Sequence, residues 1–269
     1  MAINLRGAVA CVTGGGRGIG LATAKALAER GAIVWIGDID QALVERAAAE
    51  SGGKLKAAHL DVCDADSFRA FLKAAEADGP ISLLVNNAGI MRTGEFHTQD
   101  MMGQQREIAI NFSGVVTGMR LVLPGMLERN IGHIVNLSSM AGKMTVPGAA
   151  VYTGTKFAVA GMSRAVRAEI VDSKITITCV FPSVVRTELT EGIDTRGAPT
   201  IDPEDVALAI VESCRHGRGE VTLPRWVKPI GLVEEALPEK LAGFVKRALG
   251  AQRRVMTDNE KRRAYNSRA

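Results

Sequence analysis

The sequence predicts an α/β fold, built as a doubly wound parallel sheet of about seven strands with helices on both faces. Two observations support this prediction. Short apolar runs alternate with segments of helical period from Ala8 to about Val180. The runs are apolar at consecutive positions rather than at every second one, which is typical of strands covered on both faces. Repeated strand–helix–strand crossovers then place these strands in parallel in one sheet.

Each strand is expected where an apolar run lies between turn-forming residues. The predicted strands are Ala8–Thr13, Ala32–Gly37, Lys54–Leu60, Ile81–Asn86, Ile131–Ser138, Lys174–Val180 and Glu220–Leu223. The amphipathic stretches between them predict helices over Ile19–Arg30, Ala65–Asp78, Thr98–Arg129 and Tyr152–Asp172. No internal repeat or low-complexity segment interrupts this alternation, so a single domain accounts for it.

The alternation changes after Val180. Turn-forming residues are frequent over 183–201, and we expect this segment to be a long mobile loop. Asp202 and Pro203 then mark the start of a helix, because a capping carboxylate followed by proline at the first helical position is a common beginning.

Residues 225–269 differ from the rest of the chain in charge. They carry 11 Lys and Arg against 5 Asp and Glu, whereas the whole chain has a net charge of +4. We therefore assign residues 1–224 to the α/β domain, and 225–269 to a basic helical C-terminal extension broken by Pro229 and Pro238. This extension either packs on the domain or projects from it. It is suited to solvent, to an acidic surface of a partner subunit or to an anionic membrane surface.

The composition predicts a cytoplasmic protein with a large core. Hydrophobic residues make up 46% of the 269 residues, and no run of 18 or more apolar residues suggests a membrane span. The first residues lack the apolar stretch of a secretory signal. Nucleic acid is not an expected partner, because no known binding module is present. The scattered histidines predict no metal site, and the cysteines, which follow no zinc or redox spacing, are expected to be buried thiols: Cys11, Cys63, Cys179 and Cys214.

The first predicted strand runs into a glycine-rich turn that a helix follows at once. The turn reads Thr13-Gly14-Gly15-Gly16-Arg17-Gly18-Ile19-Gly20. Glycines permit a tight turn, close approach of the backbone to a pyrophosphate, and close packing of the helix on the sheet. The helix N-terminus then offers free N–H groups to the phosphates. In this context the turn predicts a dinucleotide site. Its predicted cofactor-binding residues are Gly14, Arg17, Gly18, Ile19 and Gly20.

The second predicted strand leads to Asp38, about 20 residues after the glycine turn. A carboxylate at this point accepts hydrogen bonds from both hydroxyls of an adenosine ribose and repels a 2′-phosphate. Arg17 acts in the opposite direction, since a cation in the turn can pair with that phosphate. No Arg or Lys follows Asp38 directly, so we predict NAD as the cofactor in preference to NADP. The alternative role for Asp38 is the N-cap of a helix that begins near Gln41.

Tyr152 and Lys156 are four residues apart and therefore lie on one face of a helix. Ser139 stands at the end of a predicted strand, from which it can reach the same point. Each of these features alone is common on protein surfaces and at strand ends. Together with the glycine turn, Asn86-Asn87-Ala88-Gly89 and Asn111, all in this order and spacing, they resemble the single-domain short-chain dehydrogenase/reductase family. The resemblance covers roughly residues 5–224.

The resemblance implies a Rossmann-type fold and an oxidoreductase that transfers a hydride between NAD(H) and an alcohol or carbonyl substrate. Tyr152 would donate or accept the proton, and Lys156 would also bind the nicotinamide ribose. Ser139 would hold the substrate oxygen, and Asn111 would hold a water that links Lys156 to solvent. Free tyrosine has a pKa near 10. Lys156 and the oxidised nicotinamide, each roughly 5 Å from the phenol, would lower that value toward neutrality.

The resemblance extends the cofactor site beyond the glycine turn. It places Asp61 beside the adenine, although a plain turn at the strand end accounts for Asp61 nearly as well. It implies that Asn87 stabilises the sheet while small neighbours leave space for the nucleotide, and that the loop after the sixth strand contacts the carboxamide. The further implied cofactor residues, besides Tyr152 and Lys156, are Asp61, Val62, Asn87, Ala88, Gly89, Pro182, Val185 and Thr187.

The loop departs from the family pattern at Ser183, which stands where the family has a glycine. If that position requires a positive φ, a serine costs about 1 kcal/mol or more. We therefore expect the loop to close differently from the family pattern.

The substrate pocket is expected around Ser139 and Tyr152. Its candidate residues are Met91, Met140, Met144, Val146, Val184 and Leu189, and only Lys143 and Arg186 bring fixed charge nearby. Flexible methionines suit an apolar, lipid-like or steroid-like substrate, although methionine is equally common as core filling. The alternative function is a catalytically idle NAD(H)-binding sensor or scaffold.

The resemblance also implies self-association. Family members pair through the helices predicted at Thr98–Arg129 and Tyr152–Asp172, so we expect a homodimer or a homotetramer. A further hypothesis makes the basic extension an anchor that brings the enzyme of a lipophilic substrate to a membrane surface.

Overall fold

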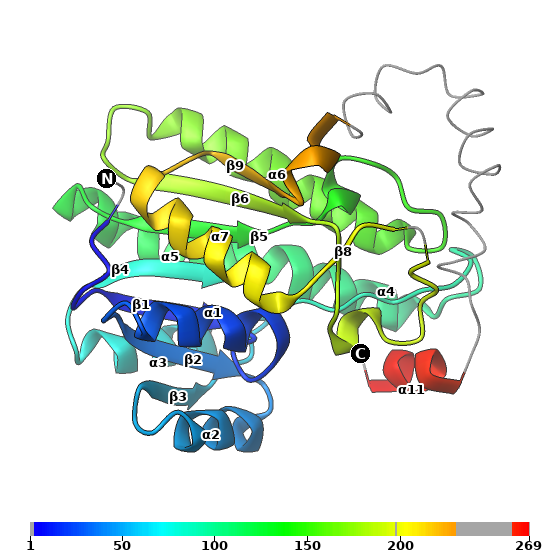
Figure 1. Ribbon diagram of the computed structural model, residues 1–269, viewed down its shortest axis with the longest axis horizontal. Helices are drawn as coiled ribbons and strands as arrows, with labels where there is room; N and C mark the ends of the chain where they lie inside the picture. Colours follow the sequence, from blue (N-terminus) through cyan, green and yellow to red (C-terminus); the bar gives the residue numbers. More distant parts are fainter. Residues whose placement is uncertain (1–2, 197, 230–259, 269) are drawn as a thin grey trace.

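Seven strands form one sheet in the computed structural model, which describes residues 3–196, 198–229 and 260–268. All neighbouring strands pair in parallel, in the order β3-β2-β1-β4-β5-β6-β9 (Figure 1). The strand order reverses between β1 and β4, and such a switch point opens a crevice at the carboxyl ends of the strands. The predicted doubly wound parallel sheet is confirmed. Its strands are β1 (Val9–Thr13), β2 (Ile33–Asp38), β3 (Leu55–His59), β4 (Ile81–Asn86), β5 (His133–Leu137), β6 (Thr176–Pro182) and β9 (Glu220–Leu223).

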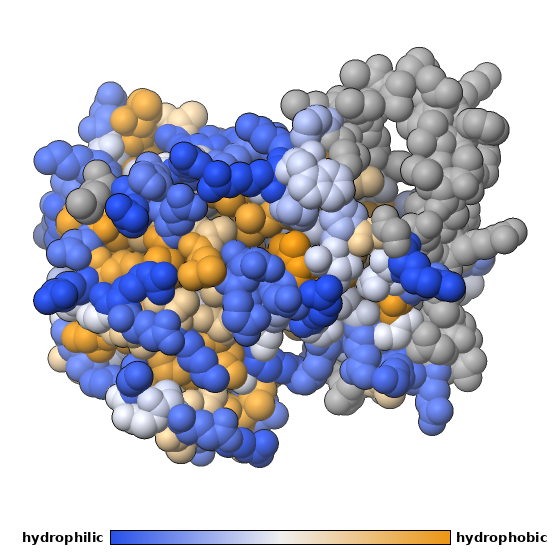
Figure 2. Space-filling view, in the orientation of Figure 1, coloured by the Kyte–Doolittle hydropathy of each residue, from blue (hydrophilic) through white to orange (hydrophobic). Residues whose placement is uncertain are grey.

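Helices cover both faces of the sheet. One layer consists of α1 (Gly18–Ala28), α2 (Gln41–Glu50) and α7 (Pro203–His216), and the other of α3 (Ala65–Glu76), α5 (Gly114–Arg129) and α6 (Ala150–Glu169). Successive strand residues point to opposite layers: Val12 packs with the α1 layer and Cys11 with the α3 layer. Figure 2 looks onto the α1–α7 side, where hydrophilic residues border patches of hydrophobic ones. This double burial explains why the strands are apolar at consecutive positions.

The helix predicted over Thr98–Arg129 is continuous but irregular. It consists of α4 (Met101–Ile108), a π-helical turn η1 (Ala109–Ser113) and α5. The predicted start is wrong because Asp100 caps the helix, its carboxylate accepting a hydrogen bond from the Gly103 N–H at 2.7 Å. By length and apolar composition alone, the stretch Met101–Arg129 qualifies as a membrane span, which the prediction from uninterrupted apolar runs missed. In the fold, α5 packs against β4 and α3 in the core.

The segment 183–201 contains more regular structure than the predicted long loop. Short strands β7 (Val184–Val185) and β8 (Thr200–Ile201) pair in parallel, with a 3-10 turn η3 (Glu188–Thr190) between them. Ser183 donates a hydrogen bond from its hydroxyl to the Pro199 carbonyl at 2.6 Å. Asn130 is the non-glycine residue with positive φ in the described part of the chain, so Ser183 carries no such strain. The serine therefore fits this loop without the expected cost.

Helix α7 begins where the sequence predicts. Pro203 occupies the first turn, and the Asp205 carboxylate accepts a hydrogen bond from the Asp202 N–H at 3.0 Å. The helix ends at Gly217, whose left-handed φ of 59° is favourable only for glycine and a few polar residues.

Three of the four cysteines are buried as expected, but Cys63 is exposed, so the prediction of four buried thiols is wrong there. Cys63 follows the third strand in a turn closed by Asp61, whose carboxylate accepts the Cys63 N–H at 2.8 Å. For the buried residues Cys179 and Cys214, burial raises the thiol pKa to about 12.

The C-terminal extension is described at its two ends. Residues 230–259, with the predicted break at Pro238, lie outside the described residues. Helix α11 (Glu260–Arg268) contacts the segment between β4 and α4 through Tyr265 and Asn266, which brings it to the carboxyl edge of the sheet (Figure 1).

Candidate active site

The glycine turn joins β1 to α1 and faces the crevice at the strand ends. Gly14 and Gly18 both adopt positive φ, at 62° and 52°. A Cβ on Gly14 would lie 2.9 Å from the Ala88 Cα, so the turn needs glycine there. Arg17 occupies the N-cap position of α1 without a side-chain capping bond, and the first turn of α1 holds no acidic residue. The N–H groups of this helix start are therefore available to an anion, which fits a cofactor pyrophosphate.

A pocket of about 470 Å³ lies over this turn. Eleven predicted cofactor residues line it: Gly14, Arg17, Gly18, Ile19, Asp38, Asp61, Val62, Asn87, Ala88, Gly89 and Thr187. The lining also includes Ile90, Arg106, Ile110 and Tyr265, which the sequence analysis missed. Arg106 and Ile110 belong to a helix whose cofactor-facing side has no sequence signature.

The other predicted cofactor residues do not line this pocket. A Cβ on Gly20 would overlap the Gly14 carbonyl oxygen, so Gly20 permits packing of α1 on the turn rather than direct contact. Pro182 and Val185 are buried at the end of β6 and in β7. Tyr152 and Lys156 lie deeper still, on α6, at the catalytic end of the crevice.

Asn87 fixes the glycine turn to the end of β4. Its amide donates hydrogen bonds to the carbonyl oxygens of Thr13 at 2.9 Å and Gly14 at 3.0 Å. In return, the Thr13 hydroxyl accepts the N–H groups of Asn87 and Ala88, both at 3.0 Å. Two of the predicted motifs are thus one unit that shapes the cofactor site.

Asp38 lines the pocket at the end of β2. The helix cap that we considered for it belongs to Asp40 instead, whose carboxylate accepts the Leu43 N–H at 3.0 Å. The opposing cation, Arg17, forms an ion pair with Glu188 at 2.6 Å. The pocket therefore presents a carboxylate at the end of β2, while Arg17 is paired with another acid.

Tyr152, Lys156 and Ser139 are brought together by two elements. Tyr152 and Lys156 project from α6, and Ser139 follows β5 at the start of a 3-10 turn η2 (Met140–Gly142). The Lys156 ammonium donates a hydrogen bond to the Leu137 carbonyl at 2.9 Å and lies 5.5 Å from the centroid of the Tyr152 ring. The Ser139 hydroxyl lies close enough to the Tyr152 phenol to lower its pKa. The predicted catalytic group is therefore assembled at one point.

Burial controls the charges of these groups. Burial raises the pKa of Tyr152 above its ordinary value, and the Ser139 hydroxyl only partly offsets this. Burial also lowers the pKa of Lys156 to about 8. The protein without a bound cofactor thus keeps the phenol neutral. A positively charged nicotinamide ring at this end of the crevice would favour the phenolate.

Asn111 lies in the π-helical turn η1 and is completely buried. Its amide donates to the Ile90 carbonyl and accepts the Ile90 N–H, each at 2.8 Å. A Cβ on Gly89 would lie 3.1 Å from the Asn111 Oδ1 and 3.7 Å from the Lys156 Nζ, so these groups surround one small space. The structure places Asn111 beside Lys156, and its predicted link through a water stays a prediction.

Glu107 is a site residue that the sequence analysis missed. It lies one helical turn before Asn111 and is completely buried. One carboxylate oxygen accepts the Arg92 N–H at 3.0 Å, and the other has no hydrogen-bond partner among the described residues. Burial raises the pKa of Glu107 to about 7, against the opposing charges of Arg92, Lys156 and Arg262. An acidic residue four positions from a predicted catalytic asparagine was the available sequence signal.

An apolar cluster surrounds the catalytic tyrosine. Tyr152 packs with Met91, Ala141 and Ala149, and Val146, Leu189 and Ile193 lie against them. Of the other pocket candidates, Met140 and Met144 pack into the main core on the α6 side, and Val184 lies in β7, partly exposed. Lys143 pairs with Glu220 and Arg186 with Asp202. The side chains around the phenol are therefore mostly apolar.

The sequence is similar to those of known dehydrogenases. The sequence pattern of the short chain dehydrogenase family matches residues 8–197. The chain is 36% identical over 197 residues to the 2,5-dichloro-2,5-cyclohexadiene-1,4-diol dehydrogenase LinX of Sphingobium indicum, covering 72% of this chain and 79% of that one. It is 29% identical over 257 residues to estradiol 17-beta-dehydrogenase 11 of Pongo abelii, covering 93% and 85%.

A solved structure has the same fold. The short chain dehydrogenase/reductase of Burkholderia phymatum, in complex with NAD, superposes with a TM-score of 0.81 at 23% identity, covering 87% of this chain and 95% of that one. The fold, the assembled Ser–Tyr–Lys group and the matched family pattern lead to the same conclusion: the chain belongs to the short-chain dehydrogenase/reductase family and is an oxidoreductase that transfers a hydride with a nicotinamide cofactor.

Proposed function

We propose that this enzyme interconverts an apolar secondary alcohol and its ketone, with NAD(H) as the cofactor. The observation that carries the proposal is the meeting of Ser139, Tyr152 and Lys156 at the end of the crevice that begins at the glycine turn. The bound cofactor supplies or accepts the hydride. The protein side chains transfer the proton, hold the substrate oxygen and position the cofactor.

Tyr152 moves the proton. In alcohol oxidation its phenolate accepts the hydroxyl proton, and in ketone reduction its phenol donates a proton to the oxygen. Ser139 holds the same oxygen by a hydrogen bond and stabilises the charge that develops on it. Lys156, fixed by the Leu137 carbonyl, holds the nicotinamide ribose and favours the phenolate through its charge.

Replacing Tyr152 by Phe tests the catalytic assignment. The variant keeps the ring that packs against Met91 and removes the proton-transferring hydroxyl. We expect kcat to fall by roughly 10²-fold or more, while NADH binding, followed by fluorescence, is retained. A wild-type protein that binds NADH but turns over no alcohol or ketone would favour the sensor or scaffold instead.

Asp38 supports NAD over NADP. It lines the adenosine end of the pocket, and Arg17 is paired with Glu188 rather than left for a 2′-phosphate. We expect kcat/KM to be higher with NAD, and Asp38→Asn to narrow the difference, because that variant removes the repelling charge. A wild-type preference for NADP would overturn this choice.

The apolar cluster around Tyr152 supports the substrate class. Met91, Leu189 and Ile193 offer surface to hydrocarbon and no fixed charge. The similar proteins from Sphingobium indicum and Pongo abelii are named for a cyclic diol and for estradiol. A panel of linear, cyclic and polycyclic alcohols and ketones, read by NADH absorbance, tests the class. Faster turnover of charged, sugar-like alcohols than of apolar ones would contradict it.

The assembly and surroundings of the enzyme stay predictions. We propose a homodimer or homotetramer in the cytoplasm, paired through α4–α5 and α6. The anchor hypothesis for residues 225–269 predicts that the full chain sediments together with anionic liposomes. Replacing basic residues of the extension by neutral ones should lower the fraction of protein that sediments with them. Equal sedimentation with neutral and anionic liposomes would argue against it.

A further inference from the structure

Helix α11 inserts a buried arginine beside the active site. Arg262 is 2% exposed, although arginine is rarely buried unless its donors are paired. Its guanidinium donates hydrogen bonds to the Thr93 hydroxyl at 2.8 Å and to the Leu189 carbonyl at 2.9 Å. It also donates to the Met91 carbonyl. One side chain thus joins the segment after β4 to the segment after β7.

Tyr265 stands one turn after Arg262, and the two side chains stack. The guanidinium carbon lies 4.5 Å from the centroid of the Tyr265 ring, and the Tyr265 hydroxyl accepts the Met91 N–H at 3.3 Å. Met91 in turn packs against Tyr152. Tyr265 also lines the cofactor pocket, as Leu189 and Thr187 do. The Tyr265 side chain therefore lines the cofactor pocket and contacts Met91, a member of the apolar cluster that contains the catalytic tyrosine.

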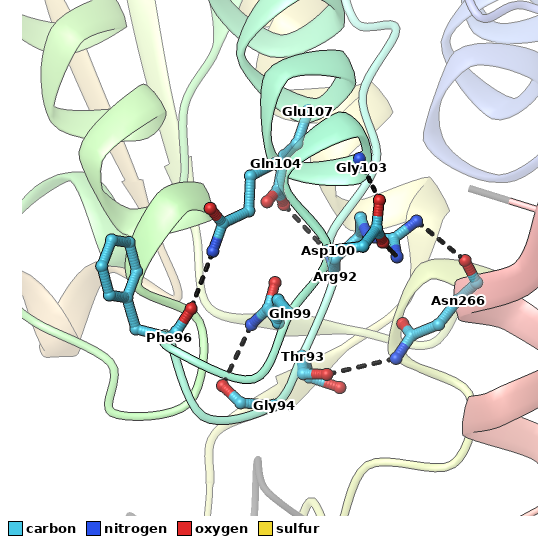
Figure 3. A network of polar contacts seen from close by, with 10 residues as sticks. All are labelled: Arg92, Thr93, Gly94, Phe96, Gln99, Asp100, Gly103, Gln104, Glu107 and Asn266. Atoms are coloured by element: carbon cyan, nitrogen blue, oxygen red, sulfur yellow. Dashed lines mark hydrogen bonds and ion pairs between the residues drawn. The ribbon is translucent and has the colours of Figure 1, made fainter.

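Asn266, the residue after Tyr265, also holds α11 in place. Its side-chain amide donates a hydrogen bond to the Thr93 carbonyl at 3.1 Å, and its backbone carbonyl accepts one from the Arg92 guanidinium at 3.0 Å (Figure 3). Arg92 is also paired with Asp100, and its backbone N–H binds Glu107. These contacts fix α11 to the segment that leads from the cofactor site into α4.

We propose that α11 forms the wall of the substrate pocket near the catalytic tyrosine, where Tyr265 limits the size of the substrate and Arg262 is the positioning residue that holds it there. This rests on the proposed alcohol and ketone activity. Tyr152 belongs to the catalytic helix α6, whereas Tyr265 belongs to the C-terminal extension. In this proposal the extension determines which substrate shapes reach Tyr152.

Size selection follows from the ring of Tyr265. A tyrosine-to-alanine change removes the whole ring from a packed wall and leaves room for a larger substrate. A tyrosine-to-phenylalanine change keeps the ring and removes only the hydroxyl bound by Met91. Loss of Arg262 releases the anchor that fixes the ring. Tyr265→Ala and Arg262→Ala should therefore act alike, and Tyr265→Phe should differ from both.

Steady-state kinetics with 2-butanol, cyclohexanol and 1-tetralol test the wall. We expect Tyr265→Ala and Arg262→Ala to raise the ratio of kcat/KM for the bulky over the small alcohol by roughly tenfold or more. Tyr265→Phe should keep the wild-type ratio. The matched control is Lys261→Ala, because Lys261 is an exposed neighbour on the same helix that pairs only with Glu191 among described residues, at 3.4 Å. Unchanged ratios, or one common factor for all alcohols, would overturn the proposal.

A second measurement does not need turnover. The chain has two tyrosines, so fluorotyrosine labelling gives two ¹⁹F resonances, assigned with Tyr152→Phe and Tyr265→Phe. NADH with cyclohexanol forms a complex that cannot react, since both are already reduced. We expect both resonances to shift when cyclohexanol is added. A shift of Tyr152 alone would overturn the wall and leave the proposed function standing. No shift together with no turnover would overturn both.

Discussion

Tyr152, Lys156 and Glu107 show how strongly burial shifts the pKa values of the groups in a site. Burial raises the pKa of Tyr152, lowers that of Lys156 to about 8 and raises that of Glu107 to about 7. All three changes favour the neutral form of the group. A positively charged nicotinamide ring bound beside the buried phenol would therefore have a large effect on the pKa of Tyr152.

Glu107 gives a prediction for stability against pH. Its pKa is about 7 in the fold and 4.5 ordinarily, so the folded state keeps a proton that the unfolded chain loses between these values. Stability should therefore fall as pH rises from about 4.5 to 7 and then stay level. The shift corresponds to roughly 3 kcal/mol at pH 8 as an upper figure.

The variant Glu107→Gln removes the titrating proton and keeps an oxygen for the Arg92 N–H. We expect it to match the wild type in urea unfolding near pH 4.5 and to exceed it at pH 8, by up to about 3 kcal/mol. Glu50→Gln, on the exposed end of α2, serves as the control and should change neither value. Equal or lower stability of Glu107→Gln at pH 8 would show that the carboxylate is compensated by its neighbours.

The junction between η2 and α6 is the element that aligns the catalytic residues. The Ser138 hydroxyl donates to the Lys156 carbonyl at 2.9 Å, and the Lys156 ammonium donates to the Leu137 carbonyl. Gly142 permits this approach: a Cβ there would lie 2.7 Å from the Lys156 carbonyl oxygen and would overlap the Ser138 hydroxyl. The segment after β5 and helix α6 therefore come into contact at Gly142, where there is no room for a side chain.

We predict that Gly142→Ala separates Ser139 from Tyr152 and lowers kcat. A misplacement of about 1 Å in a catalytic group can cost roughly 10²-fold, so a loss of tenfold or more is expected. NADH affinity should stay near the wild-type value, because the glycine turn is remote from the junction. Gly154→Ala is the control, since a Cβ on that exposed part of α6 meets nothing within 4 Å. Equal kcat for both variants and the wild type would exclude the alignment role.

The elements themselves could be predicted well where burial is uniform. Strands β4 and β9 match their predicted bounds, and the remaining strands differ by one or two residues, because both faces of each strand are apolar. The segment 183–201 was predicted only as a loop. Its short strands are held by the pairing of Val185 with Ile201, a contact between two-residue strands that leaves no periodic pattern.

In the molecule as a whole, the site residues that belong to sequence motifs could be predicted. The site residues that only tertiary contacts bring together could not. Ser139, Tyr152 and Lys156 follow a recognisable spacing. Arg262 binds Met91 across 171 residues of sequence, and its neighbours in the chain give no sign of that partner. Only the arrangement of β4, the η3 segment and α11 around one edge of the sheet makes the arginine part of the site.

Helices α4 and α6 carry exposed apolar residues of the kind expected at an interface between subunits. Met101 and Met102 on α4 are 71% and 76% exposed, and Phe157 on α6 is 37% exposed. The two helices pack side by side. Apolar groups of this size on the helices through which the family pairs are suited to a second copy of this chain.

We predict that Phe157→Asp weakens self-association, because it places a charge where the apolar face would lose contact with water. Sedimentation velocity or light scattering after gel filtration should show a lower mass than for the wild type at equal concentration. Val171→Asp is the control, since Val171 is 74% exposed but lies just beyond the end of α6. A wild type that runs as a monomer would refute the oligomer itself. An oligomer of unchanged mass in Phe157→Asp would instead move the interface to another surface.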